Sequence, residues 1–176
     1  YSIAVSWRWL IPLRKSAQLI VLHDSLLPKY RGFSPLVNML INKEPYIGVI
    51  ALYANKEYDK GEIITQRRIP VSYPIKINDA IDLITPLYSE LICWIFENLR
   101  NKLDIKSTPQ IESESSYSLW RDEDDYHIDW DGTAEEILQF IYSVGYPFKG
   151  AFAIVNGKIV RIHDACVVND VKVENR

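Results

Sequence analysis

The sequence predicts an α/β fold, because short apolar runs that read as buried strands alternate with segments of helical periodicity. The runs SIAVS at residues 2–6 and LIVL at residues 19–22 are typical of strands covered on both faces of a mostly parallel sheet. At residues 78–101, apolar positions recur at spacings of three and four, which predicts a long helix that packs on such a sheet. The 176 residues are enough for one domain with its own core.

Proline, glycine and apolar runs place the other elements of the first hundred residues. A short helix is expected at residues 11–17, with Pro12 tolerated in its first turn. Ser34 is a good N-cap and Pro35 suits the first position of a second helix, which we expect to end near Asn42. The further expected strands are residues 47–54 and 62–71, joined by the polar link NKEYDKG.

The second half of the chain differs in composition from the first and predicts a small appended region. Residues 102–118 are polar and rich in serine, which is typical of a linker or a long surface loop. Thr133 and Glu136 have capping-box spacing ahead of a helix that we expect to end near Val144. Asn156-Gly157 favours a hairpin turn. The expected strands are 151–155, 158–163 and 165–173, and the expected division is a core at 1–101, a linker at 102–118 and a C-terminal region at 119–176.

Composition and charge argue against several classes of protein. Apolar residues make up 48% of the chain and charged residues 24%, which is a globular composition. No apolar run approaches the length that crosses a bilayer, and the net charge of −3 argues against a polyanionic partner. Cys93 and Cys166 lie far apart in segments that read as helix and strand, so we expect buried thiols in a reducing, cytoplasmic compartment.

The beginning of the chain is unusual for a domain of this class. It starts at Tyr1, and the first apolar run follows at once. No charged segment ahead of an apolar segment marks a signal peptide. Because a domain rarely opens in the middle of a sheet, we expect further N-terminal strands to precede this sequence.

The stretch LHDSLLPKYRGFSP at residues 22–35 places a histidine at the carboxyl end of an apolar strand. Ligands of open α/β sheets bind at this end of the strands, and an imidazole titrates near pH ~6.5, so His23 is a candidate acid and base. A purely structural histidine is the alternative. The stiff loop that follows, and the free N–H groups of the helix that starts near Ser34, favour a binding role.

Asp59 lies in the turn YDKG between two expected strands. Aspartate and glycine favour turns on their own, so a plain turn residue is one interpretation. If the turn folds back against His23, the carboxylate would orient the imidazole and raise its pKa. The sequence does not show that contact.

Two stretches together, LHDSLLPKYRGFSP and IGVIALYANKEYDKGEIITQ, resemble the formyltransferases that use 10-formyltetrahydrofolate. That family includes methionyl-tRNA formyltransferases and nucleotide-sugar N-formyltransferases. Its H-x-SLLP-x-YRG loop and its later D-x-G turn are both present, and Asp59 follows His23 by 36 residues (59 − 23), as in the family. The resemblance covers residues 2–71 and continues, more weakly, through IDWDGTAEEI and GYPFKGAF.

The resemblance implies a Rossmann-like formyltransferase fold with a small C-terminal region of helix and hairpin. It implies that His23 is the catalytic acid and base and that Asp59 raises its pKa. It implies 10-formyltetrahydrofolate as co-substrate and no metal; Trp7 or Trp9 would stack on the pterin or pack in the core. The implied folate contacts are Val5, Ser6, Trp7, Ser25, Leu26, Leu27, Pro28, Asn55, Lys56, Glu57 and Tyr58.

The chain departs from the family pattern near the histidine. The family usually carries asparagine two residues before it, where this chain has Val21, whose side chain cannot donate a hydrogen bond to a developing oxyanion. Phe33 stands where some members have arginine, which removes one polar folate contact or builds an apolar wall. Arg8 matches a frequent family position, and a solvated charge is its alternative role.

The C-terminal region bears on the acceptor of the formyl group. Methionyl-tRNA formyltransferases carry a larger tRNA-binding domain there, and the acidic segment RDEDDYHIDWDG would repel phosphates. We therefore expect the amine of a nucleotide-linked amino sugar, as in lipopolysaccharide biosynthesis. Methionyl-tRNA is the first alternative and a non-catalytic folate-binding relative the second. The oligomeric state stays open, a homodimer included.

Three remaining features read as structural. The acids Asp122–Asp125 are expected to be solvated and not to bind a metal. His127 and His163 lack partners at metal-ligand spacing. The segment 146–148 (YPF) is expected to be a packed turn, with a place beside the acceptor as the alternative.

Overall fold

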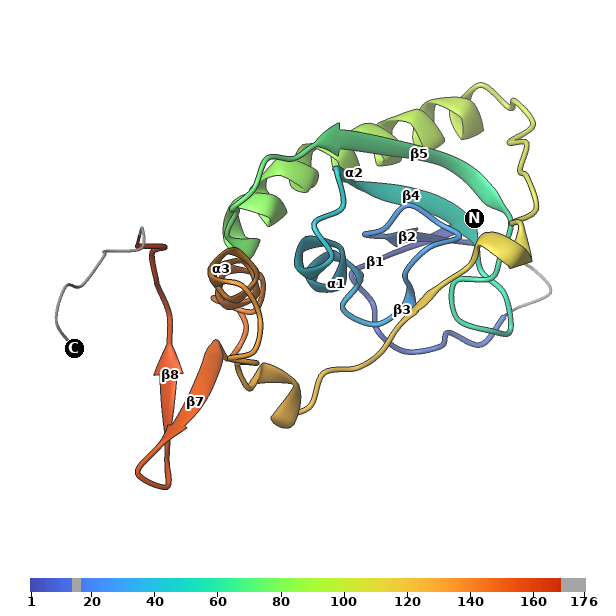
Figure 1. The fold of residues 1–176 in the computed structure, drawn as a ribbon. Helices are drawn as coiled ribbons and strands as arrows, with labels where there is room; N and C mark the ends of the chain where they lie inside the picture. Colours follow the sequence, from blue (N-terminus) through green and yellow to red (C-terminus); the bar gives the residue numbers. More distant parts are fainter. Residues whose placement is uncertain (14–16, 169–176) are drawn as a thin grey trace, which may run out of the picture.

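A computed structural model describes residues 1–13 and 17–168, and its centre is a mixed four-stranded sheet (Figure 1). The strands, in spatial order, are β1 (Ser2–Val5), β2 (Leu19–His23), β4 (Tyr46–Tyr53) and β5 (Ile63–Pro70). Only β1 and β2 are parallel; β2 with β4 and β4 with β5 are antiparallel. The α/β class is confirmed, but the expectation of a mostly parallel sheet is wrong, because short connections between β4 and β5 permit only antiparallel pairing.

Three helices share one core. These are α1 (Pro35–Ile41), α2 (Ile77–Arg100) and α3 (Ala134–Ser143). Figure 1 shows α2 running beside β4 and β5, with α1 and α3 next to each other at one end of the sheet. The buried positions of α2 recur at helical spacing, as the sequence predicts.

The central strand β4 is covered on both faces, which its continuous apolar sequence predicts. Ile47, Val49 and Ala51 belong to the large core that contains the helices. On the other face, Ile50 and Leu52 pack against Leu27 of the loop that follows β2. That loop therefore covers the sheet where a second layer would otherwise be needed.

The segment at residues 102–118 is not a free linker, although its composition predicts one. Its two-residue strand β6 (Tyr117–Ser118) pairs with β3 (Arg31–Gly32), and Ile105 is buried in the core. A short 3₁₀ helix, η1 (Glu112–Glu114), lies between these two points. A second, η2 (Asp124–Tyr126), lies near the start of the C-terminal region. Several polar side chains of the segment, those of Ser107, Gln110, Glu112 and Ser116, form hydrogen bonds with other parts of the protein, which composition alone does not reveal.

Two expectations about helices need correction, one about a short helix and one about a helix cap. Residues 11–13 and 17 are not helical, and 14–16 lie outside the described residues; so short a segment has little helical stability of its own. Ser34 precedes α1, but its φ of 49° is left-handed and its side chain makes no capping hydrogen bond. Pro35 does occupy the first helical turn, as expected.

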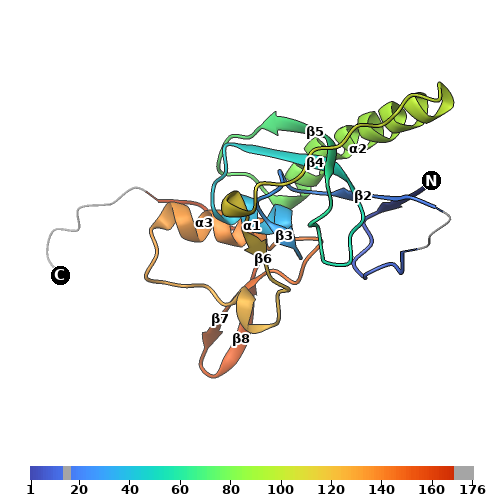
Figure 2. The ribbon, with the colours of Figure 1, turned by 90° about the vertical axis from the view of Figure 1, so that its right-hand side faces the viewer.

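The C-terminal region follows its local signals closely. Thr133 and Glu136 form the predicted capping box of α3. Strands β7 (Ala151–Val155) and β8 (Lys158–Ile162) form the predicted hairpin, which projects away from the sheet (Figure 2). Residues 163–168 are not a strand, and the rest of the strand expected at 165–173 lies outside the described residues.

The cysteines are exposed, so the expectation of buried thiols is wrong. Cys93 lies on α2 between Leu91 and Ile95, both fully buried, so helical periodicity turns it outward. Cys166 follows the hairpin. None of the described helices is both long and apolar enough to cross a membrane.

Candidate active site

His23 is the last residue of β2, and its side chain is only 7% exposed. Alternation along the strand places it on the same face of the sheet as Val21. Its Nε2 lies 3.0 Å from the carbonyl oxygen of Tyr30. Because a carbonyl oxygen only accepts hydrogen bonds, Nε2 carries the hydrogen, and Nδ1 is the nitrogen left to gain or lose a proton.

The turn that follows β4 brings Asp59 to this histidine. Asp59 Oδ2 lies 3.7 Å from His23 Nδ1 and accepts a hydrogen bond of 2.8 Å from the main-chain N–H of Gly32. The carboxylate is mostly shielded from solvent. The turn does fold back against His23, which is the condition for Asp59 to act on the imidazole. At 3.7 Å the two side chains are too far apart for a direct hydrogen bond.

Two glycines let the backbone close around this pair. A Cβ on Gly61 would lie 1.6 Å from the carbonyl oxygen of Tyr53, so only glycine fits where the turn rejoins β5. Gly32 has a φ of +100°, a left-handed conformation that favours glycine. These contacts give the glycines of the YRG and D-x-G motifs a physical reason.

Gln110, from the segment expected to be a linker, holds the Asp59 turn in place. Its Nε2 donates to the main-chain carbonyls of Asp59, at 2.6 Å, and Gly61, at 2.7 Å. Its Oε1 accepts from Nε of Arg31, a fully buried residue that also donates to Glu112 and Tyr117. This hydrogen-bond network ties the loop after β2, the Asp59 turn and the 102–118 segment into one unit. Sequence reasoning missed Gln110 because nothing in its local sequence distinguishes it from a solvated loop residue.

A cavity of about 450 Å³ opens beside His23. Aromatic side chains from three separate segments meet there: Phe33 lies 5.2 Å from Tyr58 and 5.5 Å from Trp120 between ring centroids. The guanidinium of Arg8 lies 5.0 Å from the Trp120 ring. The lining residues are Ser6, Arg8, His23, Asp24, Gly32, Phe33, Ser34, Pro35, Tyr58, Tyr88, Trp120, Arg121, Tyr126 and Phe148.

A second, smaller cavity of about 50 Å³ lies on the other side of the Asp59 turn. Tyr58 borders both cavities, whereas Asp59 and Val21 border only the small one among the residues described. Its lining is mostly apolar, with Asn55 and Glu57 as polar neighbours. The lining residues are Ala4, Trp7, Trp9, Leu10, Ile11, Leu19, Val21, Leu52, Ala54, Asn55, Glu57, Tyr58 and Asp59.

The residues implied as folate contacts divide into three groups. Trp7, Asn55, Glu57 and Tyr58 line the small cavity, and Ser6 and Tyr58 line the large one. Val5 lies on the edge strand β1, and Lys56 is exposed in the same turn as its neighbours. The lining of neither cavity includes Ser25, Leu26, Leu27 or Pro28 among the described residues. Leu26 and Leu27 pack against the hydrophobic clusters of the sheet, and the Ser25 hydroxyl donates to the Lys29 carbonyl within the loop.

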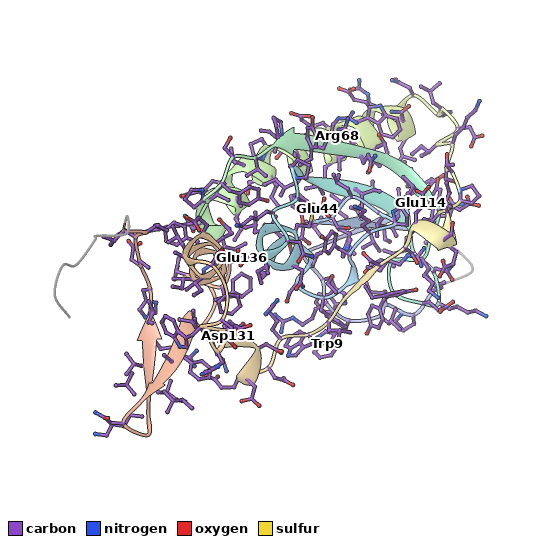
Figure 3. The ribbon with its side chains drawn as sticks, in the orientation of Figure 1. Trp9, Glu44, Arg68, Glu114, Asp131 and Glu136 are labelled. Atoms are coloured by element: carbon purple, nitrogen blue, oxygen red, sulfur yellow. The ribbon has the colours of Figure 1, made fainter. Side chains whose placement is uncertain are left out.

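The other residues singled out from the sequence also have defined places. Trp7 and Trp9 are both well exposed and not part of the core, and Figure 3 shows Trp9 far from Arg68 of β5. The packed turn expected at 146–148 is wrong for Tyr146, which is 78% exposed, while Phe148 borders the large cavity. No group of three potential metal-ligating side chains occurs in the described part of the chain.

Burial changes the titration of two groups that line the large cavity. It raises the pKa of Tyr88, helped by the nearby charge of Asp24, so the hydroxyl stays protonated at neutral pH. It lowers the pKa of Arg121, since removal from water disfavours the charged form. Trp120 and Arg121 were missed by sequence reasoning, because the 102–118 segment carries them to His23 over a long distance in the chain.

Two family models match this chain. The formyl transferase model matches residues 5–81, and the model of the formyl transferase C-terminal domain matches residues 121–175. The methionyl-tRNA formyltransferase of Macrococcus caseolyticus is 32% identical over 151 residues, which cover 81% of this chain and 46% of that protein. That of Ehrlichia canis is 29% identical over 156 residues, covering 89% and 49%. The chain thus spans about half the length of these curated relatives.

Solved structures agree with this match. HypX from Aquifex aeolicus, in complex with tetrahydrofolic acid, has a TM-score of 0.75 at 25% identity, covering 89% of this chain and 28% of that one. A 4-N formyltransferase from Francisella tularensis has a TM-score of 0.75 at 24% identity, covering 94% and 71%. The fold, the paired motifs and both family models lead to one conclusion: the chain belongs to the formyl transferase family.

Proposed function

We propose that this protein transfers a formyl group from 10-formyltetrahydrofolate to the amine of a nucleotide-linked amino sugar. The observation that carries the proposal is the placement of His23 Nδ1 beside the shielded carboxylate of Asp59, at the wall of an aromatic cavity. The chain's membership of the formyl transferase family supports the reaction class.

The reaction requires proton transfers that His23 is placed to perform. The attacking amine loses a proton as its bond to the formyl carbon forms, and the departing folate nitrogen gains one as its bond breaks. With Nε2 engaged by the Tyr30 carbonyl, His23 takes up and returns this proton at Nδ1. Asp59 stabilises the imidazolium while the proton is held, since an opposite charge at 3.7 Å favours the charged form.

The small cavity suits the pterin end of the folate. Flat aromatic side chains (Trp7, Trp9 and Tyr58) and polar groups (Asn55 and Glu57) provide stacking and hydrogen-bonding partners for a polar ring system. Bound 10-formyltetrahydrofolate would supply the formyl group and the leaving nitrogen. Ligand sites usually enclose a few hundred Å³. The exposed Trp7 and Trp9 side chains would therefore swing outward to admit it.

The surroundings of the large cavity favour a small acceptor. Arg8 and Arg121 line this cavity, and the exposed acids Asp122, Asp124 and Asp125 follow Arg121 closely in the chain; we call them the acidic rim. Glu123, between them, pairs with Lys149 and Arg161. A small phosphorylated molecule can reach the arginines, but a long polyanion must also pass the acidic rim, which repels it at moderate ionic strength.

Methionyl-tRNA is the second candidate acceptor. The two relatives named above, at 32% and 29% identity, are methionyl-tRNA formyltransferases, and the second family model describes the C-terminal domain of formyl transferases. The sequence similarity reflects common ancestry with these enzymes, whereas the acidic rim is part of the surface that an acceptor meets. We therefore place the amino sugar first.

The test is a transfer assay with the full-length protein. The protein is incubated with 10-formyltetrahydrofolate and either a panel of nucleotide-linked amino sugars or methionyl-tRNA, and mass spectrometry detects the added formyl group. His23→Asn is expected to lower the rate about 10²- to 10⁴-fold. His163→Asn, at an exposed histidine of the C-terminal region, is the matched control and should keep the wild-type rate.

Each outcome of this assay has a clear meaning. A sugar product that depends on His23 supports the proposal, and a product on methionyl-tRNA alone replaces the acceptor. Folate binding without any product would identify a non-catalytic relative. A near-normal rate in His23→Asn would remove His23 from the mechanism.

A further inference from the structure

Arg121 lies at the large cavity with its charge only partly satisfied. Its two terminal nitrogens donate to Asn38 Oδ1 at 2.8 Å and to the main-chain carbonyl of Asp125 at 3.0 Å. Its Nε is buried and has no hydrogen-bond partner. A buried donor without a partner costs free energy, so an unfilled position of this kind calls for a ligand or a bound water.

Neither partner of Arg121 carries a charge. Asn38 contributes an amide oxygen and Asp125 a main-chain carbonyl, and no carboxylate lies within 4.0 Å of the guanidinium among the described residues. Arg31, in the same region, differs from Arg121 because its guanidinium pairs with the Glu112 carboxylate at 2.8 Å. The guanidinium of Arg121 is therefore held in place by neutral groups. The charge of Asp125 acts on it without forming an ion pair, so the guanidinium can still pair with an anion.

The cavity around Arg121 supplies further features of a nucleotide site. Arg8 adds a second cation, held over the ring of Trp120. Phe33, Tyr58 and Trp120 offer apolar surface to a flat ring or a sugar. The same cavity reaches His23. A ligand with an anionic group at one end and an amine at the other would meet the arginines and the histidine at the same time.

We infer that Arg121, assisted by Arg8, binds a phosphate of the acceptor and so fixes its amine at His23. The inference rests on the proposed function and names the anion-binding residues of that acceptor site. Guanidinium groups bind phosphate oxygens through charge-assisted hydrogen bonds, and each terminal nitrogen of Arg121 has a second N–H besides the one that bonds to Asp125 or Asn38. The ligand is a nucleoside diphosphate sugar, small enough to enter past the acidic rim.

The experiment measures binding of UDP and dTDP, without a sugar, to the full-length protein by isothermal titration calorimetry. Arg121→Gln is expected to weaken binding about 10- to 100-fold, as lost charge-assisted hydrogen bonds do. Arg8→Gln should weaken it about 3- to 5-fold, since this exposed side chain contributes a less desolvated charge. Arg68→Gln is the matched control, because Arg68 stacks on Tyr46 at the far side of the sheet and should leave binding unchanged (Figure 3).

Folding is checked separately by thermal unfolding of each variant without ligand. If Arg121→Gln does not fold, Arg8→Gln decides, because Arg8 is exposed and makes only a stacking contact. Binding by the folded Arg121→Gln protein within twofold of wild type would overturn the inference. Failure of the wild-type protein to bind either nucleotide would also overturn the inference, even if that protein bound methionyl-tRNA through Arg121.

The inference and the proposed function fail in different ways. If UDP or dTDP binds through Arg121 but no amino sugar is formylated, the anion site stands and the transferase assignment falls. If formylation depends on His23 yet proceeds equally well in Arg121→Gln, the transferase assignment stands and the anion site falls.

Discussion

Two turns of this protein each contain a left-handed residue but have opposite surroundings. Asn156, in the β7–β8 hairpin, and Asp59, between β4 and β5, are both left-handed, with φ of 51° and 52°. Gly157 has open space around it, whereas a Cβ on Gly61 would meet the Tyr53 carbonyl at 1.6 Å. The hairpin turn is specified by its own dipeptide, while the Asp59 turn is specified by what packs on it.

This difference shows where the protein uses long-range contacts. The described hairpin strands are largely exposed to solvent at their tip, and the turn between them serves to reverse the chain. The Asp59 turn is bound by Gln110, from 51 residues away, and by Gly32, from 27 residues away. Left-handed residues cost conformational energy, and at Asp59 the surrounding hydrogen bonds compensate for it.

The largest expected effect comes from adding a methyl group at each turn. Gly61→Ala should lower the free energy of unfolding by about 3 kcal/mol, because the backbone must move to relieve the clash with Tyr53. Gly157→Ala should lower it by only about 1–2 kcal/mol, the cost of a left-handed alanine. Urea unfolding of both variants measures the difference, and equal losses would contradict the contrast between the turns.

A second variant tests the small cavity that the Asp59 turn borders. Val21 lies on the His23 face of β2 and borders the small cavity, so Val21→Asn would place a hydrogen-bond donor beside the reacting formyl oxygen. The rate of transfer should rise by up to about 10²-fold, the converse of deleting such a donor. Val21→Leu is the apolar control. A rate that is unchanged or lower in Val21→Asn would mean that another donor already fills this role.

A third variant removes the long-range hold on the turn. Gln110→Ala deletes the hydrogen bonds to the Asp59 and Gly61 carbonyls, and we expect kcat to fall about tenfold as Asp59 loses its position. The KM for 10-formyltetrahydrofolate should change little, which separates positioning from folate binding. Gln66→Ala, on the exposed side of β5, is the control. Equal falls in both variants would point to general destabilisation instead.

The smallest effect is expected on the hairpin. Ile154 is 61% exposed, so Ile154→Thr should change the free energy of unfolding by less than about 0.5 kcal/mol. Ile50→Thr, at a fully buried position of β4, should cost about 2 kcal/mol or more. Urea unfolding again provides the measurement. A large loss at Ile154 would show that the hairpin surface is covered in solution.

Local sequence signals predicted the structure correctly where the stabilising interactions involve only neighbouring residues. The capping box of Thr133 and Glu136 and the turn at Asn156-Gly157 both form as expected, because their hydrogen bonds and backbone angles involve only neighbours. The burial of β4 on both faces follows from its unbroken apolar sequence. The cap expected at Ser34 does not form: this residue is left-handed, and its side chain makes no capping hydrogen bond.

The sequence by itself determined the α/β class, most element positions and the family resemblance, because apolar periodicity and compact motifs encode these locally. The meeting of His23 with Asp59, 36 residues later, depends on long-range contacts and is seen only in the tertiary structure. Only the tertiary structure decided that residues 102–118 hold the active-site turn, and that Arg121 faces the cavity of His23. Such contacts join polar side chains far apart in the chain. A polar residue that will bind a buried partner has the same composition as one that will face water, and only folding distinguishes them.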